Sequence, residues 1–111
     1  MQIEKKKSFD SVFKYGKKHK SEYFTIYFKK ETDLKIGIVI SKKVGNAVLR
    51  NYVKRIIREL FRKTKDKFED NMHMIIIPSK KYNWDKLQFK RVKKSWMESI
   101  SKINQINNEL C

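Results

Sequence analysis

The sequence predicts an α/β (α+β) two-layer sandwich around a small sheet, and two observations lead to that prediction. Segments rich in β-branched and aromatic residues alternate with segments whose apolar residues recur at helical spacing, in the order αββαβα. That order contains a strand–helix–strand unit, which packs its helix against one face of a sheet. The length of 111 residues suits one domain, so we expect residues 1–111 to form a single domain.

The N-terminal region predicts a short helix over about residues 8–15. Its apolar residues recur at positions i, i+3 and i+4: Phe9, Val12 and Phe13. Ser8 is a favourable N-cap residue, and we expect Gly16 to end the helix as its C′ residue.

Two strands are expected next, joined by a polar turn over residues 29–33. Residues 23–28 are β-formers throughout, and their side chains alternate between two faces. One face carries Tyr23, Thr25 and Tyr27, and the other carries Phe24, Ile26 and Phe28. Residues 34–40 predict the second strand, which we expect to pair with the first strand as a hairpin.

The clearest helical pattern covers residues 47–66. One arc of this helix is apolar: Leu49, Val53, Ile56, Ile57 and Leu60. Beside it runs a row of cations at i, i+4 spacing: Arg50, Lys54, Arg58 and Arg62. Like charges at this spacing repel, so tertiary burial or an anionic partner must offset the repulsion.

The C-terminal half predicts one more strand and one more helix. The continuous apolar run over residues 74–77, followed by Pro78, is typical of a strand that is buried on both faces. A last helix is expected over about residues 86–106, where apolar residues recur every three or four positions.

Charge is the strongest constraint on function. The 28 basic and 12 acidic residues give a formal net charge of +16. The basic residues gather in three segments, with net charges of +5 over residues 1–20, +8 over residues 42–67 and +6 over residues 80–94. Such an excess favours a polyanionic partner, and nucleic acid is a better candidate than an anionic membrane surface.

Catalysis by the chain alone is not expected. The carboxylates are scattered and do not form the convergent group that a metal-dependent nuclease needs. His19 and His73 have no partner at metal-ligand spacing, a Gly-rich phosphate loop is absent, and Cys111 is the single cysteine. We therefore expect no catalytic residue and no metal ligand in the chain. A cytoplasmic location is expected, because neither a membrane span nor a secretory signal is evident.

Contact with RNA is the positive signal in the sequence. Between residues 42 and 65 there are nine bases and one acid, Glu59, whereas a solvated helix face normally mixes both signs. Four aromatic side chains could stack on unpaired bases: Phe9, Phe13, Tyr23 and Tyr27. For the phenylalanines a place in the core is the stronger interpretation, and for the tyrosines the two alternatives are evenly balanced.

A long segment of the chain resembles a known family. Residues 41–62 have the sequence SKKVGNAVLRNYVKRIIRELFR, which resembles the signature of the bacterial ribonuclease P protein component. The similarity extends to GIVI at residues 37–40, to FDSVFKYG at residues 9–16 and to the strand at residues 75–77. The family's core is an Arg-Asn-Arg motif, and this chain has Tyr52 at the third position, so that one cation is missing.

The resemblance implies a function and partners. Proteins of this family pair with a large catalytic RNA that uses Mg²⁺, and together they remove the 5′ leader from precursor tRNA. The implied partners are therefore the RNA subunit and precursor tRNA, without a membrane or a further protein. The Mg²⁺ is expected to be bound mainly through RNA, and the protein alone needs no cofactor.

The resemblance also implies two sites. The family binds the single-stranded leader in a cleft between the first helix and the sheet, and the matching residues here are Phe9, Phe13 and Tyr27. A basic segment of the family faces the RNA subunit. The matching residues are Lys42, Lys43, Arg50, Asn51, Lys54, Arg55, Arg58 and Arg62.

The family fold implies an αβββαβα-type order with an unusual left-handed βαβ crossover. General topology rules alone predict a right-handed crossover, which holds in about 98% of cases. The family order also has one strand more than the sequence pattern predicts, and we expect this strand within residues 41–45.

Three other classes of protein share part of these features. A small structural RNA-binding protein, such as a ribosomal protein, has the same composition and differs only in lacking the segment at residues 41–62. A membrane-surface protein with a basic amphipathic helix would have to expose the apolar arc of residues 47–66. A DNA-binding helix-turn-helix protein is a weaker candidate, because the basic helix lies between strands.

Overall fold

The computed structural model describes residues 6–109, with side chains described from residue 9 onward. The regular elements are α1 (Lys6–Tyr15), β1 (Lys17–Lys20), β2 (Phe24–Lys30), β3 (Lys35–Ile38), α2 (Ala47–Thr64), β4 (Met72–Pro78) and α3 (Phe89–Glu109). Three short 3₁₀ helices connect them: η1 (Lys42–Val44), η2 (Lys65–Lys67) and η3 (Trp84–Lys86). No helix in the described part of the chain is long and apolar enough to cross a membrane.

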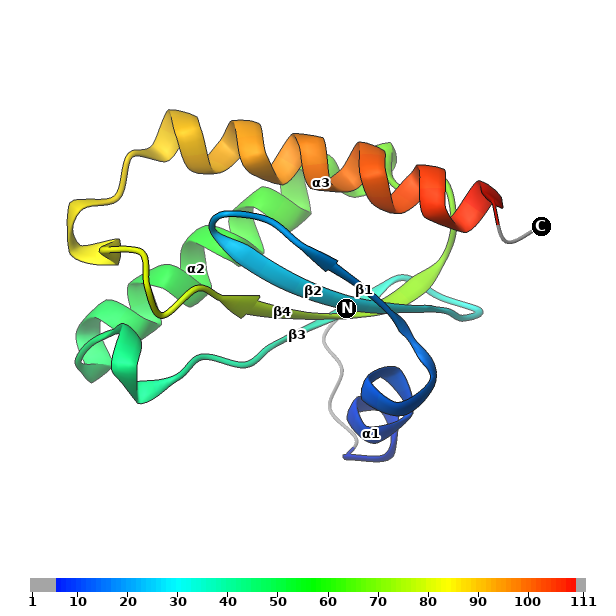
Figure 1. The fold of residues 1–111 in the computed structure, drawn as a ribbon, viewed down its shortest axis with the longest axis horizontal. Coiled ribbons are helices and arrows are strands. Elements are labelled where there is room, and N and C mark those ends of the chain that lie inside the picture. The colour runs from blue at the N-terminus through cyan, green and yellow to red at the C-terminus, as the bar shows by residue number, and fades with distance from the viewer. Residues whose placement is uncertain (1–5, 110–111) are drawn as a thin grey trace.

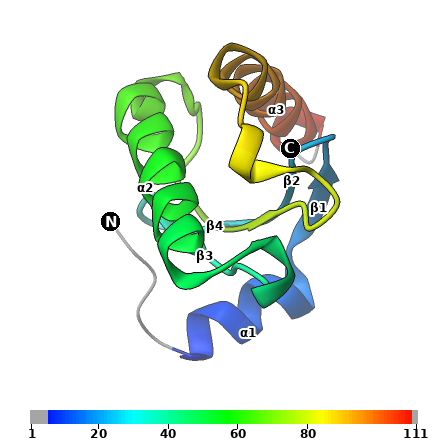
Figure 2. The ribbon, with the colours of Figure 1, turned by 90° about the vertical axis from the view of Figure 1, so that its left-hand side faces the viewer.

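The four strands form one mixed sheet in the order β1-β2-β4-β3. β2 pairs antiparallel with β1 and with β4, and β3 pairs parallel with β4. α2 and α3 lie side by side on one face of the sheet, and α1 lies on the opposite face (Figures 1 and 2). The expected α+β class is confirmed as a four-stranded mixed sheet with three helices, of which α1 adds a small layer on the second face.

Two expectations about the strands are wrong. The additional strand is β1, and residues 42–44, where it was expected, form η1 instead. The hairpin between residues 23–28 and 34–40 does not form, because β1 and β4 already occupy both edges of β2. β3 therefore pairs with the free edge of β4, and it runs parallel to β4 because α2 carries the chain back across the sheet.

The ends of the first helix also differ from the prediction. Ser8 lies inside α1 and is not its N-cap residue. Gly16 does follow the last helical residue, and its N–H donates to the carbonyl of Val12 at 2.9 Å. However, Gly16 is not among the described residues with a positive φ. A glycine is needed for space, because a Cβ at this position would lie 2.7 Å from the carbonyl oxygen of Phe28.

The main core lies between the sheet and the helices α2 and α3. Alternate residues of the central strands supply its sheet side: Phe24, Ile26, Phe28, Met74 and Ile76. The predicted apolar arc of α2 is confirmed, since Val53, Ile56, Ile57 and Leu60 are buried and Leu49 packs against them. Trp96 of α3 is fully buried, and its indole N–H donates to the hydroxyl of Thr64 at 3.0 Å. α2 and α3 are therefore fixed on the sheet by their apolar faces, and their polar faces point to solvent.

A smaller core lies under α1 on the other face. Val12 and Ile75 are completely buried there, and Phe9, Tyr27 and Ile77 pack around them. Ile75 and Ile76 are neighbours in β4 that face opposite cores, which confirms that this strand is buried on both sides.

Candidate RNA interface

The basic helix α2 begins with a well-defined turn. Asn46 is its N-cap residue, and the Asn46 side chain accepts a hydrogen bond from the backbone N–H of Leu49 at 2.9 Å. Gly45 precedes it with a φ of 157°, and a Cβ there would lie 2.6 Å from Cδ2 of Leu49. Lys42 and Lys43 are exposed in η1, directly before this turn. The local sequence thus places two lysines beside the N-terminus of the helix.

Most of the predicted RNA-facing residues of α2 point to solvent. Asn51, Arg55, Arg58 and Arg62 are exposed, whereas Arg50 and Lys54 are half-buried. The N-terminal half of α2 and the 3₁₀ helix η3 enclose an open groove of about 1070 Å³. Its α2 wall includes Asn51, Lys54, Arg55 and Arg58, and its η3 wall includes Asn83, Trp84 and Asp85. The structure therefore brings four of the eight predicted residues together along one side of a groove, whereas Lys42, Lys43, Arg50 and Arg62 do not line it.

Arg62 differs from the other cations of this row, because it has a carboxylate partner in the chain. Its guanidinium donates to both carboxylate oxygens of Glu59, at 3.2 and 2.8 Å. These hydrogen bonds lower the pKa of Glu59 and raise that of Arg62. Both side chains are exposed, so the pair contributes little to stability. Within residues 6–109, Lys54, Arg55 and Arg58 form no ion pair with a carboxylate.

Tyr52 has a role that the missing cation of the motif did not suggest. Its ring is 40% exposed, and the guanidinium carbon of Arg55 lies 5.7 Å from the ring centre. A cation–π contact of this kind holds the arginine in place without neutralising it. The departure from the Arg-Asn-Arg core thus removes one charge and orients another.

Arg50 is held differently from its neighbours. Its Nε atom is buried and has no hydrogen-bond partner among the described residues. Replacing Arg50 would therefore change packing as well as charge, whereas Arg58 offers a charge that can be removed at the surface.

A second candidate surface lies on the α1 face of the sheet. The rings of Phe13 and Tyr27 meet edge to face with centroids 5.0 Å apart, and Phe13 is 41% exposed. The ammonium of Lys18 lies 5.7 Å from the centre of the Tyr27 ring. Two aromatic rings and a cation therefore meet at one exposed place, where a base could stack and a phosphate could bind.

Phe9 and Tyr23 have structural positions instead. The ring of Phe9 packs over Gly37, where a Cβ would lie 2.5 Å from Cζ of Phe9. Phe9 therefore fixes α1 to the edge strand β3. Tyr23 is buried in the main core against Tyr82 and Trp84, so the idea that it stacks on a base is wrong. Its face was assigned from strand alternation, but it lies just before β2 and turns toward residues far along the chain.

Sequence reasoning missed the cations that border this surface. β1 places Lys18 opposite Tyr27 and Lys20 opposite Thr25. A hollow of about 600 Å³ continues from Lys20, Thr25 and Ile77 toward residues 78–82. Because β1 was not predicted, Lys18 and Lys20 could not be placed on the sheet. If residues 17–20 had been recognised as a strand, the alternation of its side chains would have placed Lys18 and Lys20 on the same face of the sheet.

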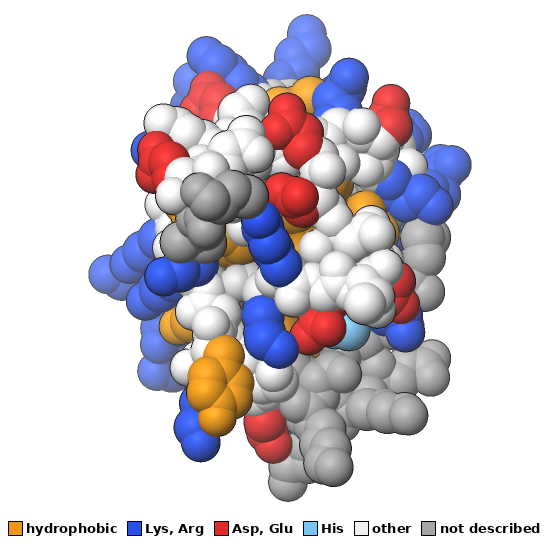
Figure 3. Space-filling view, turned by 90° about the vertical axis from the view of Figure 1, so that its right-hand side faces the viewer, with side chains coloured by type: hydrophobic (Ala, Val, Ile, Leu, Met, Phe, Trp, Pro, Cys, Tyr) orange, Lys and Arg blue, Asp and Glu red, His pale blue; other side chains and the backbone are white. Residues whose placement is uncertain are grey.

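The two ends of the molecule differ in charge. The end formed by η1, η3 and the start of α2 carries the groove described above. The opposite end shows Asp and Glu side chains interspersed with Lys and Arg (Figure 3). Residues 6–109 hold no group of three or more His, Cys, Asp or Glu side chains that could bind a metal ion. What the groove and the α1 face offer is cations and aromatic rings.

The apolar arc of α2 bears on the membrane alternative. Ile56 and Leu60 are buried in the protein core and cannot insert into lipid. The membrane-surface interpretation of the basic helix is therefore wrong for this arc.

Comparisons with known proteins agree with this arrangement. The family model described as Ribonuclease P matches residues 1–104. The chain is 41% identical over 78 residues to the ribonuclease P protein component of Syntrophus aciditrophicus, a match that covers 68% of this chain and 65% of that protein. It is 31% identical over 102 residues to the component from Thermotoga maritima, which covers 88% of this chain and 87% of that one.

Solved structures give the same result at the level of the fold. The RNase P protein from Thermotoga maritima superposes with a TM-score of 0.84 and 29% identity, over 92% of this chain and 96% of that one. The Staphylococcus aureus protein superposes with a TM-score of 0.78 and 31% identity, over 92% and 93% of the two chains. The chain therefore belongs to the bacterial ribonuclease P protein family, the protein subunit of an RNA-catalysed endoribonuclease that processes tRNA.

Proposed function

We propose that this chain joins the RNA subunit of ribonuclease P to the 5′ leader of precursor tRNA, with a different face for each. The contact with the RNA subunit uses the basic residues of η1 and α2: Lys42, Lys43, Arg50, Asn51, Lys54, Arg55, Arg58 and Arg62. The leader contact uses Phe9, Phe13 and Tyr27, and Phe9 also fixes α1 to β3 beside them. The chain acts as a single RNA-binding domain in the cytoplasm, where precursor tRNA is made.

One observation carries the first contact. α2 buries its apolar arc in the core, and its opposite face carries cations of which only Arg62 has a carboxylate partner within the described residues. The i, i+4 repulsion along this face is therefore left uncompensated in the free protein. Phosphates of a folded RNA would remove that repulsion and release counterions, so binding should be strongly dependent on salt.

The second contact follows from the α1 face. A single-stranded leader can stack a base on the exposed ring of Phe13 and the half-buried ring of Tyr27 and place a phosphate beside Lys18. Mature tRNA has no leader and loses this contact. The protein would thus favour substrate over product without touching the bond that is cleaved.

The chemistry would belong to the RNA subunit. Mg²⁺ bound through RNA would activate the attacking water. The protein's contribution is charge and position: its cations reduce the repulsion between two polyanions, and its aromatic rings hold the leader extended. The family resemblance further implies a left-handed crossover for β3–α2–β4, which we propose for this chain as well.

The direct test is reconstitution. Purified protein, ribonuclease P RNA and precursor tRNA are combined at a low Mg²⁺ concentration, singly and together, and release of the leader is followed. We expect no cleavage by the protein alone and much faster cleavage by the two subunits together than by the RNA alone. Cleavage by the protein alone, or an RNA whose rate the protein does not change, would contradict the proposal.

A further inference from the structure

The third basic segment of the sequence has no part in the function proposed above. Residues 80–94 carry seven cations and one acid, Asp85. The cations are Lys80, Lys81, Lys86, Lys90, Arg91, Lys93 and Lys94. A net charge of +6 on fifteen residues is as one-sided as the charge of α2, and it needs a physical reason.

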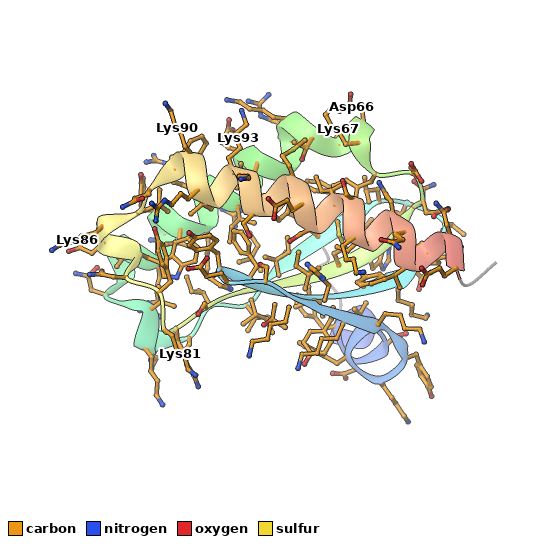
Figure 4. The ribbon with its side chains drawn as sticks, turned by 45° about the horizontal axis from the view of Figure 1, so that its top comes forward. Asp66, Lys67, Lys81, Lys86, Lys90 and Lys93 are labelled. Atoms are coloured by element: carbon orange, nitrogen blue, oxygen red, sulfur yellow. The ribbon has the colours of Figure 1, made fainter. Side chains whose placement is uncertain are left out.

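This segment lies across the groove from α2. Asn83, Trp84 and Asp85 of η3 line the groove opposite Lys54 and Arg58. Lys86 continues from that wall, and α3 begins three residues later. Lys86 points outward at this end of the molecule, and Lys90 and Lys93 point outward from the first turns of α3 (Figure 4). All three lysines are exposed.

These lysines have no carboxylate partner among the described residues. Within residues 6–109, none of Lys86, Lys90 and Lys93 forms an ion pair. The first carboxylate that follows them in α3 is Glu98, more than one helical turn beyond Lys93. Their repulsion, like that along α2, is left for a partner to remove.

The chemistry of the surface favours RNA over a lipid membrane. A helix that lies in a membrane surface needs an exposed apolar face, but Val92, Trp96 and Ile100 of α3 are buried in the core. Phe89 is the large apolar side chain of α3 that remains exposed, and one ring is a small area for insertion. Cations on the α2 side of an open groove, continued by exposed lysines that follow its η3 side, instead suit a nucleic-acid backbone, whose phosphates repeat at short intervals.

We infer that Lys86, Lys90 and Lys93 form a second phosphate-binding wall that extends the η3 side of the groove, so that α2 and the start of α3 together hold the backbone of the RNA subunit. This inference rests on the proposed function and adds a surface to it. It predicts that the RNA-contacting face is wider than the segment at residues 42–62.

The experiment compares two double variants with equal loss of charge. Lys90→Gln with Lys93→Gln removes two cations from the proposed wall. Lys67→Gln with Lys102→Gln removes two exposed lysines from the end of η2 and from the second half of α3, away from the groove. Affinity for ribonuclease P RNA is measured from low to high salt, and melting temperatures establish that both variants fold.

We expect the wall variant to reduce the salt-dependence slope of log K by about two relative to wild type, because each lost phosphate contact reduces it by about one. The matched variant should keep the wild-type slope. Lys86→Gln with Lys90→Gln serves as a second wall variant and should behave like the first.

Equal slopes for wall variants and matched variant would overturn the inference while leaving the proposed function intact, provided that wild type binds the RNA. Absence of RNA binding by wild type would contradict the proposed function itself. A further measurement tests whether wild type and the wall variants bind vesicles of phosphatidylcholine and phosphatidylserine. Vesicle binding that the wall variants lose, together with an unchanged RNA slope, would assign this surface to a membrane and overturn the inference.

Discussion

The two faces of the sheet use the same strands for different purposes. Toward α2 and α3, Phe28 and Ile76 contribute to a large, closed core. Toward α1, their neighbours Tyr27 and Ile77 belong to a small cluster that stays partly open. Alternation along β2 and β4 therefore places a closed core on one side of each strand and, on the other, the partly open cluster that we propose for leader binding. The comparison teaches that substitutions one residue apart should affect different properties, and this can be tested.

The largest effect is expected on the closed face. Trp96→Ala removes a fully buried indole and its hydrogen bond to Thr64, so we expect the free energy of unfolding to fall by about 3–5 kcal/mol. Urea denaturation followed by circular dichroism measures it. Tyr15→Ala is the control on the α1 side, since Tyr15 is 67% exposed and should cost less than about 0.5 kcal/mol. A loss below about 1 kcal/mol for Trp96→Ala would show that the core is not where stability resides.

On the open face the effect should appear in binding. Phe13→Ala and Tyr27→Ala each remove one of the two rings that meet at the surface. We expect each to weaken the binding of precursor tRNA to the holoenzyme by about 1–3 kcal/mol and to leave mature tRNA unaffected. Tyr15→Ala, an aromatic truncation on the same helix, should change neither ligand. Equal losses for precursor and mature tRNA would indicate a folding defect and not a leader site.

Stability and leader binding should be coupled where α1 meets β3. Gly37→Ala would place a methyl group 2.5 Å from the ring of Phe9, which must then move. We expect a loss of about 1–3 kcal/mol in unfolding free energy from overpacking, together with weaker leader binding because α1 shifts. Unchanged binding of precursor tRNA in a destabilised Gly37→Ala protein would separate α1 from the leader site.

The smallest expected effect concerns pH. The His19 ring contacts the hydroxyl of Ser99 at 3.2 Å, and burial, with Lys102 as a second cause, lowers the pKa of His19 below 6.5. The unfolded chain therefore binds a proton at His19 more readily than the folded protein does. Its contribution to stability is complete above about pH 6.5 and is lost as the pH falls through the lower folded-state pKa.

His19→Gln should accordingly flatten the decline of unfolding free energy between about pH 7.5 and pH 5.5, measured by urea denaturation at each pH. A decline as steep as that of wild type would mean that His19 is not perturbed by its surroundings.

The elements with strong periodic signals could be predicted from the sequence. The apolar arc of α2 and the doubly buried strand β4 are evident because burial repeats at the helical period or without interruption. β1 has the sequence KKHK, which carries no apolar signal, and it is a strand because its backbone pairs with β2. The partner of β3 was equally hidden, since pairing depends on which strand edges remain free.

The candidate sites were predictable to different extents. The cations of α2 follow from their spacing: Arg55, Arg58 and Arg62 are exposed as expected, whereas Arg50 and Lys54 are half-buried. The pairing of Phe13 with Tyr27 came from the family resemblance, because only the fold brings α1 onto β2. The burial of Tyr23 depends on Tyr82 and Trp84, about sixty residues away, and no local pattern encodes it.

The most direct test of the central claim is the salt dependence of RNA binding when α2 loses charge. Lys54→Gln with Arg58→Gln removes two cations that line the groove, and Lys67→Gln with Lys102→Gln is the control of equal charge. If phosphates of the RNA subunit neutralise α2, the slope of log K against log salt should fall by about two in the variant with Lys54→Gln and Arg58→Gln. The control variant should keep the wild-type slope. Identical slopes in wild type and both variants would show that the RNA binds elsewhere.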